Sequence, residues 1–320
     1  MNILQRMLSL LARLPVLLPL LLTIALGFLI YNIPDLPGLV ARIAHLPYHI
    51  FGIVFGLALG YLSIKAVQFR WFLQGLQIEV TWSQLIISFA VGEIALAIPA
   101  GVYAQNYVLR RVQGSDFALS SAATTAVLIA EGGTALLIAA IIGVQGFSWL
   151  RPAVLGILGA IIITVIVFRR LRSAEHAVAE FLRTGPLGRV GIWILEFLTG
   201  LGELASLRVV LVAVLLAAGY LFCIVAGFFM IAISLGLPNF SFPQAISVYT
   251  FALAVGLGVA EASGTVAMEQ LGYNADEALS VLFAFRLVWT ACVWLVAGSS
   301  IIILRREIMQ PRQPPTLDET

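Results

Sequence analysis

Long apolar runs separated by short polar or basic stretches dominate this chain. Each approaches or exceeds the roughly 20 residues with which an α-helix crosses the apolar core of a bilayer. The runs cover residues 14–33, 47–64, 83–109, 117–143, 152–168, 209–235, 243–270 and 278–304. The pattern predicts an all-α integral membrane protein that forms a single membrane domain over residues 1–320.

Two of these runs are interrupted near their middle by residues that break helices. Pro99-Ala100-Gly101 divides residues 83–109, and Gly256-Leu257-Gly258 divides residues 243–270. Each run is therefore either one kinked span or a re-entrant helical hairpin, whose two short arms enter and leave on the same side. An arm of about 10 residues already reaches the middle of a 30 Å apolar core.

The basic residues distinguish these alternatives, because Lys and Arg accumulate in cytoplasmic loops. With two hairpins there are six full spans, both termini are cytoplasmic, and 15 basic residues lie inside against 2 outside. In this count Lys65 is a cytoplasmic residue, Arg42 and Arg151 lie outside, and Arg286 is buried in the membrane. With eight full spans the count becomes 8 inside against 9 outside. The charges favour two hairpins in a multi-pass protein of the inner cell membrane.

The same order of elements then occurs twice. Residues 14–143 and 152–304 each contain a span, a second span, a hairpin and a third span. Three full spans per half would invert the second half, giving the inverted-topology repeat found in many transporters. Both halves also contain a Gly-Val, a later Gly and an Ala-Leu-Ser, at residues 101–102, 114 and 118–120 and at 258–259, 272 and 278–280. Chance similarity between apolar helices is the alternative.

Two polar segments lie outside these repeats. Residues 169–206 form the main cytoplasmic segment, and the polar and apolar faces within 171–183 predict a helix on the membrane surface. A simple connector is an equally good interpretation of this segment. Residues 305–320 are predicted to form a disordered cytoplasmic tail.

Four ionisable residues are expected near the middle of the bilayer. Glu93 lies just before the tip of the first hairpin, Glu131 in the following span, Glu261 just after the second tip and Arg286 in the last span. Charges at this depth are costly and indicate function by default. Arg286 would bind an anionic headgroup, while a carboxylate would bind a cationic group or protons. The alternative is a static ion pair of Arg286 with Glu261 or Glu131, although buried pairs contribute little to stability.

The helix breaks add a second device for binding anions. The second arm of each hairpin begins with unpaired backbone N–H groups, whose partial positive charge favours an anion. Gly101 and Gly258 stand at these two tips, and Gln105 is a polar residue near the first.

Composition and missing motifs limit the chemistry. The 320 residues are 61% hydrophobic and 11% charged, which leaves no room for a separate soluble catalytic domain. No P-loop, HExxH, GxSxG or GxGxxG motif is present, so we expect no enzyme activity, cofactor or metal site.

At these residues the chain resembles the flippase-type transmembrane domain of the lysylphosphatidylglycerol synthase family, a large group of bacterial and archaeal membrane proteins. The similarity covers most of the chain, and it is most specific at Gly258-Val259-Ala260-Glu261, Gly272, Ala278 and Arg286. A first-half counterpart is formed by residues 98–101, Arg110-Arg111 and Glu131. Many members have a proline at the second tip, which this chain lacks, and the family's aminoacyl-transferase domain is also absent. The resemblance implies lipid translocation without lipid synthesis.

We therefore expect a lipid translocase that moves an anionic or zwitterionic headgroup between the leaflets. A secondary transporter for a small water-soluble substrate and a non-catalytic scaffold for lipid-modifying enzymes are the alternatives. Membrane lipid is the expected partner and nucleic acid is not, while a homo-oligomer and a contact with lipid-synthesis enzymes stay open.

Overall fold

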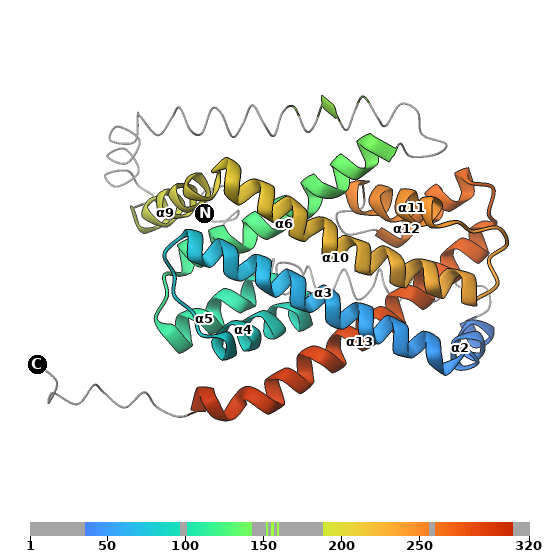
Figure 1. Ribbon diagram of the computed structural model, residues 1–320, viewed down its shortest axis with the longest axis horizontal. Helices are drawn as coiled ribbons and strands as arrows, with labels where there is room; N and C mark the ends of the chain where they lie inside the picture. Colours follow the sequence, from blue (N-terminus) through green and yellow to red (C-terminus); the bar gives the residue numbers. More distant parts are fainter. Residues whose placement is uncertain are drawn as a thin grey trace, which may run out of the picture.

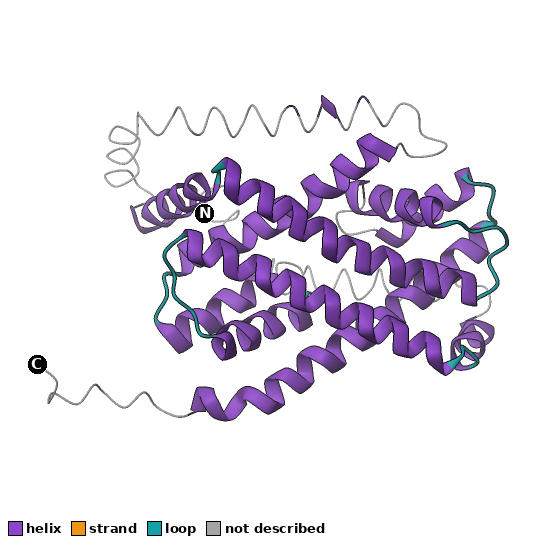
Figure 2. Ribbon diagram, in the orientation of Figure 1, coloured by secondary structure: helices purple, strands orange, loops and turns teal. Residues whose placement is uncertain are grey.

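The computed structural model describes residues 36–96, 101–142, 188–255 and 260–309, together with four separate positions between 152 and 159. These residues form helices joined by short connectors, without a β-strand among them (Figure 2). In chain order the helices are α2 (Leu36–Ala44), α3 (Tyr48–Gly75), α4 (Trp82–Ala95), η1 (Gly101–Tyr103), α5 (Ala104–Gln113), α6 (Phe117–Ile142), α9 (Gly188–Leu204), α10 (Leu207–Ser234), α11 (Phe242–Val255), α12 (Ala260–Gln270) and α13 (Ala275–Met309).

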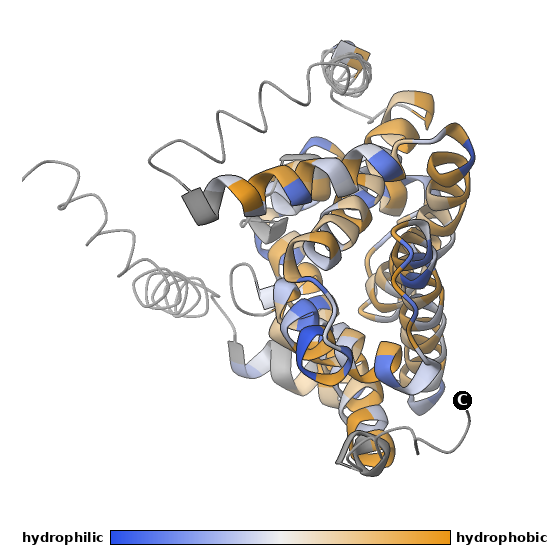
Figure 3. Ribbon diagram, turned by 90° about the vertical axis from the view of Figure 1, so that its left-hand side faces the viewer, coloured by the Kyte–Doolittle hydropathy of each residue, from blue (hydrophilic) through white to orange (hydrophobic). Residues whose placement is uncertain are grey.

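Four of the described helices are long and apolar enough to cross a membrane: α3, α6, α10 and the segment Ala275–Leu304 of α13. Large apolar side chains are exposed on their outer faces, and hydrophobic residues make up much of the helices (Figure 3). On α10, for example, Leu207, Leu211 and Leu215 recur at four-residue spacing and are each more than half exposed. Such a stripe is stable in contact with lipid and unfavourable in water. The chain is an all-α, multi-pass membrane protein.

Helices α3 and α10 lie side by side and run in opposite directions (Figure 1). The amide nitrogen Nε2 of Gln68 donates a hydrogen bond of 2.7 Å to the backbone carbonyl of Ala213. Seven residues earlier on α3, the ring of Tyr61 meets that of Tyr220, seven residues later on α10, with centroids 5.8 Å apart. Small buried residues such as Ala58 and Ala217 line both helices, as is usual where membrane helices pack closely.

The shorter helices form two pairs. Helix α4 packs against α5, and α11 packs against α12. Within the first pair, a Cβ atom on Gly101 would overlap the backbone carbonyl oxygen of Ala95, so only glycine allows the chain to pass so close to the end of α4. Gly92 similarly faces the side chain of Gln105, which brings α4 and α5 together.

The connectors that precede the two pairs have the same local structure. After α3 and α10 the chain turns through a left-handed residue, Gln77 with φ 57° and Gly236 with φ 83°. Thr81 then caps α4 by exchanging hydrogen bonds with Gln84, and the backbone N–H of Ser241 donates to the side chain of Gln244 in front of α11. Helices α3 and α10 both have 28 residues, and α4 and α11 both have 14. The comparison of the two halves by sequence found none of these structural matches.

Contacts between the two halves are reciprocal. Helix α13 packs against α4, and α6 packs against α11. In the same way α13 packs against α3, and α6 packs against α10. Among the described helices, α13 and α6 therefore make equivalent contacts with the opposite half. Each packs against a 28-residue helix and against the short helix that follows it.

Three expectations from the sequence need comment. The segment 169–206 contains α9, which packs against α6 and is a helix that the sequence interpretation missed. Helix α13 continues to Met309, so residues 305–309, placed in a disordered tail, are helical; Arg, Glu and Met are good helix formers. The predicted spans 14–33 and 152–168, apart from the four separate positions, and the surface helix 171–183 lie outside the described residues.

Candidate functional site

A buried cluster of charged side chains joins α3, α4 and α6. The ammonium nitrogen Nζ of Lys65 lies 3.2 Å from Oε1 of Glu93 and 3.3 Å from Oε2 of Glu131. The side chains of Lys65 and Glu93 are 4% and 2% exposed, while that of Glu131 is 14% exposed. We call these three residues, together with Tyr61, the Lys65 cluster.

Tyr61 completes the hydrogen bonding of the cluster. Lys65 Nζ donates to the Tyr61 hydroxyl at 2.7 Å, and that hydroxyl donates to Oε2 of Glu93 at 2.9 Å. An ammonium group has three donors, and Glu93, Glu131 and Tyr61 give it three acceptors. Both oxygens of Glu93 are engaged, whereas only Oε2 of Glu131 has a polar partner among the described residues.

Aromatic rings surround the ammonium group. Lys65 Nζ lies 4.9 Å from the centre of the Tyr61 ring and 5.6 Å from that of Tyr220, at cation–π distances. Trp289 of α13 packs edge-on against Tyr61. The Tyr220 hydroxyl is buried without a hydrogen-bond partner among the described residues. An unpartnered buried hydroxyl is unfavourable in a resting structure, and here it stands beside three charged groups.

The cluster lies near the middle of the membrane-length helices. At 1.5 Å rise per residue, Lys65 is about 5 Å from the midpoint of α3, and Glu131 is about 2 Å from the midpoint of α6. Counting Lys65 as a cytoplasmic residue was therefore wrong. The sequence analysis ended the apolar run at residue 64, just before Lys65. The helix instead continues ten residues beyond Lys65, through Arg70 to Gly75. A single lysine inside a run followed by aromatic residues was the signal that could have placed it in the membrane.

A second polar network holds α5 against α6. The side chain of Gln105 donates to the hydroxyl of Thr124 at 2.8 Å, and that hydroxyl donates to Asn106 at 2.9 Å. The hydroxyls of Tyr103 and Thr125 are 2.9 Å apart. Gln105 is 3% exposed, and its side chain forms a buried contact between the two helices.

The remaining candidate residues come from the second half. Arg286 is about 5 Å from the midpoint of the apolar segment of α13, and its side chain is exposed, next to the exposed Leu287. The buried Phe285 and Trp289 lie on the side of the helix that adjoins Arg286. Glu261 belongs to α12, but its side chain lies outside the described part of the structure, as does Gly258. The expected pairing of Arg286 with Glu261 stays a prediction, whereas Glu131 contacts Lys65.

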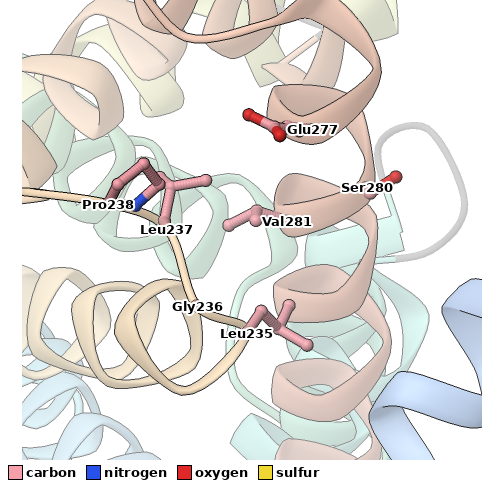
Figure 4. Close-up of a pocket in the computed structure, with 7 residues that line it drawn as sticks. All are labelled: Leu235, Gly236, Leu237, Pro238, Glu277, Ser280 and Val281. Atoms are coloured by element: carbon pink, nitrogen blue, oxygen red, sulfur yellow. The ribbon is translucent and has the colours of Figure 1, made fainter.

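Other features of the described residues contribute less. A small pocket opens between the connector that follows α10 and the start of α13, away from the Lys65 cluster (Figure 4). It is lined by Leu235, Gly236, Leu237, Pro238, Glu277, Ser280 and Val281. No group of three or more His, Cys, Asp or Glu side chains in the described residues could hold a metal ion.

Comparison with known proteins does not assign a function, so the proposal below rests on the geometry of the site. No model of a known protein family matches the sequence, and no curated protein matches it.

Proposed function

We propose that this protein is a lipid translocase, which moves a polar headgroup between the leaflets while the acyl chains stay in lipid. The observation that carries the proposal is the Lys65 cluster, because an ammonium group and a carboxylate near the middle of two membrane-length helices are buried together with a second carboxylate, Glu93 of α4. Charges in this position are costly, and in membrane proteins they mark substrate or ion pathways. Headgroup passage is the step for which a protein is needed, since polar groups are excluded from hydrocarbon.

The two short-helix pairs are proposed to be re-entrant hairpins. Helix α4 has 14 residues and is about 21 Å long, too short to cross a 30 Å apolar core. In Figure 1 the α4–α5 pair begins and ends toward the left, and the α11–α12 pair begins and ends toward the right. These positions favour two hairpins that enter the membrane from opposite sides, with six full spans in the whole chain.

Basic residues support the same topology. The last turns of α3, α5 and α13 and the first turn of α10 all lie toward the left in Figure 1. Near these ends lie Arg110, Arg111, Arg208, Arg305 and Arg306, and Arg70 lies five residues before the end of α3. By the positive-inside rule this is the cytoplasmic side, and α13 ends there, so the C-terminus is cytoplasmic. Removing Lys65 from the earlier count does not change this bias.

An inverted-topology repeat accounts for the matching elements. The antiparallel packing of α3 on α10, the equal helix lengths, the matching caps and the reciprocal contacts all fit a two-fold axis in the membrane plane. Tyr61 and Tyr220 occupy the same position in the two 28-residue helices and touch each other. The axis would pass close to this pair of rings and to the Lys65 cluster.

Within this scaffold the charged residues have different roles. Arg286 is exposed near the middle of α13, so its guanidinium group would bind the phosphate of a headgroup. The Lys65 cluster contains one positive and two negative groups, and its net negative charge favours a cationic headgroup moiety or a proton. Glu261 and the helix break at Gly258 would contribute to the same path from the second hairpin. The resemblance to the flippase-type domain of the lysylphosphatidylglycerol synthase family is consistent with these roles.

A transport assay in vesicles tests this proposal directly. The purified protein would be reconstituted with fluorescent phosphatidylglycerol or phosphatidylethanolamine, and a membrane-impermeant quencher would report the outer-leaflet fraction over time. Protein-dependent exchange of either lipid, lost in Arg286→Ala, is the expected result. Uptake of small water-soluble solutes without lipid exchange would favour the secondary transporter. If variants that lack the midplane charges are fully functional in cells, the result would favour a scaffold.

A further inference from the structure

Among the described residues, the Lys65 cluster holds two carboxylates and one cation. Lys65 contributes one positive charge, and Glu93 and Glu131 contribute two negative charges when both are ionised. Tyr61 and Tyr220 add polarisable rings and hydroxyl groups but no positive charge. Near the middle of a bilayer an uncompensated charge is expensive, so the cluster is most stable when it holds one further positive charge.

The two carboxylates differ in their polar contacts and in their exposure. Both oxygens of Glu93 are engaged, one in the ion pair with Lys65 and the other in the hydrogen bond from Tyr61, and its side chain is almost completely buried. Protonating it would place an O–H group where Tyr61 already donates. Among the described residues only one oxygen of Glu131 has a polar partner, and the side chain of Glu131 is the more exposed of the two. A proton therefore reaches Glu131 more easily and displaces fewer hydrogen bonds there.

Other neighbours of Glu131 do not remove this asymmetry. Tyr220 comes from α10, and Trp289 from α13 packs on Tyr61. Helix α9 packs against α6, where its Gly200 faces Leu119 and Ala122, and its two carboxylates, at positions 196 and 203, are exposed. Helix α5 contacts α6 through its first turn and carries its two arginines, at positions 110 and 111, exposed in the last. Helix α11, which also packs on α6, carries the half-buried Tyr249 as its titratable side chain.

We propose that Glu131 binds and releases one proton in each transport cycle, and that this proton couples headgroup movement to the proton gradient. The inference rests on the proposed function. A proton from water on one side adds to the Glu131 carboxylate and forms a carboxylic acid, and the same proton later leaves to water on the other side. No electrons are transferred. With Glu131 neutral, Lys65 and Glu93 remain as a balanced pair.

Protonation also changes how the helices are held. The Lys65–Glu131 contact links α3 to α6, while Lys65–Glu93 links α3 to α4. Neutral Glu131 loses the charge attraction to Lys65, which weakens the first link and leaves the second. Because α6 also packs against α11 of the other half, this change is transmitted to both short-helix pairs.

A metal cation is a poorer occupant of the same site. The Lys65 ammonium already lies within 3.2 and 3.3 Å of the two carboxylates and takes the central position. A sodium ion at that point would meet a positive charge instead of the several oxygen ligands it needs.

Two measurements on the reconstituted full-length protein test the inference. Infrared difference spectra over a pH series report the carbonyl band of a protonated carboxylic acid. We expect a titrating band in the wild type that is lost in Glu131→Gln and kept in Glu131→Asp, Glu93→Gln and the exposed control Glu79→Gln. Thermal unfolding in detergent establishes that each variant is folded. A band that is lost in Glu93→Gln and kept in Glu131→Gln, or no titrating band at all, would overturn the assignment.

The second measurement is the leaflet ratio of the fluorescent lipid under an imposed gradient. One proton per lipid and one pH unit correspond to about 1.4 kcal/mol, so the ratio should reach up to about tenfold in the wild type. It should fall to one in Glu131→Gln. A sodium gradient that produces the same ratio at equal pH would overturn the proposal in favour of a metal cation. Lipid exchange without any response to pH would refute coupling and leave the proposed function intact. If no lipid exchange occurs, the proposed function fails, and the infrared band still decides whether Glu131 titrates.

Discussion

Lys65 and Glu131 belong to different membrane-length helices, yet the ammonium nitrogen of the first lies 3.3 Å from a carboxylate oxygen of the second. Glu93 holds the same ammonium group at 3.2 Å from a third helix. Three parts of the chain that are far apart in sequence therefore depend on one buried cation. The energetic and functional consequences of this arrangement can be measured separately.

Removing the cation alone should be strongly destabilising. Lys65→Met leaves two carboxylates buried without their partner, and breaking a buried charged pair in this way costs about 3–5 kcal/mol. The combined variant Lys65→Met, Glu93→Gln, Glu131→Gln removes all three charges and should recover most of the stability. Unfolding in detergent, followed by circular dichroism, compares the two. Equal stability of the single and combined variants would mean that the charges do not depend on one another.

Two tyrosines at the same position of α3 and α10 form a matched pair for a second test. Tyr61→Phe removes a hydroxyl that accepts from Lys65 and donates to Glu93, and should cost about 1–3 kcal/mol. Tyr220→Phe removes a buried hydroxyl that has no partner among the described residues, so it should be neutral or stabilising. A larger loss from Tyr220→Phe than from Tyr61→Phe would contradict the hydrogen bonding described here.

The close approach of the chain to the end of α4 predicts a specific defect. Gly101→Ala places a methyl group against the Ala95 carbonyl oxygen, so the turn must open and stability should fall by at least about 1 kcal/mol. Gly298→Ala is the control, because a Cβ atom there meets nothing within 4 Å and alanine is the better helix former. Melting temperatures of both variants in the same detergent provide the comparison. A melting temperature for Gly101→Ala equal to that of Gly298→Ala would show that the turn has room for a side chain.

Re-entrant hairpins require that both ends of each short-helix pair face the same side. Single cysteines at Glu79 and Arg111 should react with an impermeant reagent only from the cytoplasm, and cysteines at Asn239 and Asn274 only from outside. The background would carry Cys223→Ala and Cys292→Ala, which replace two buried thiols. Opposite labelling of Glu79→Cys and Arg111→Cys would mean that α4, η1 and α5 cross the membrane as one kinked span.

Variants of Arg286 distinguish a role of this residue in headgroup binding from a structural role. Arg286→Ala and Glu261→Gln should each abolish lipid exchange while the protein still inserts and folds, because apolar spans drive insertion. The double variant Glu261→Gln, Arg286→Gln should be stable and inactive if the arginine binds a headgroup. Normal lipid exchange by the double variant would show that the two charges only hold each other.

Much of the architecture could be predicted from the sequence, because it depends on length and hydropathy. The spans around α3, α6, α10 and α13, and the breaks that separate α4 from α5 and α11 from α12, follow from apolar runs and helix-breaking residues. The depth expected for Glu93 and Glu131 from their distance along a helix stays a prediction. Helix α9 was missed because its segment was interpreted through its charges.

The partner of Glu131 could not be predicted from the same pattern. A lysine near the end of an apolar run is also typical of a cytoplasmic boundary, and only three-dimensional packing brings Lys65 to Glu93 and Glu131. The pairing with Arg286 was chosen because Arg286 was the only cation then assigned to the membrane. Contacts between residues 28 and 66 positions apart depend on helix orientation, which periodicity alone does not give.

The position of Lys65 also affects how the protein is made. As α3 leaves the ribosome and enters the translocon, Lys65 arrives before both of its partners, and an unpaired lysine near the centre of a helix costs about 2.5–3.5 kcal/mol on insertion scales. The 28-residue apolar helix carries this unfavourable charge until α4 follows with Glu93. Biogenesis therefore has a vulnerable interval of about 28 residues of synthesis, which ends when Glu93 enters the membrane. A nascent chain stalled within that interval would expose an unneutralised charge to lipid and be an early target for membrane quality control.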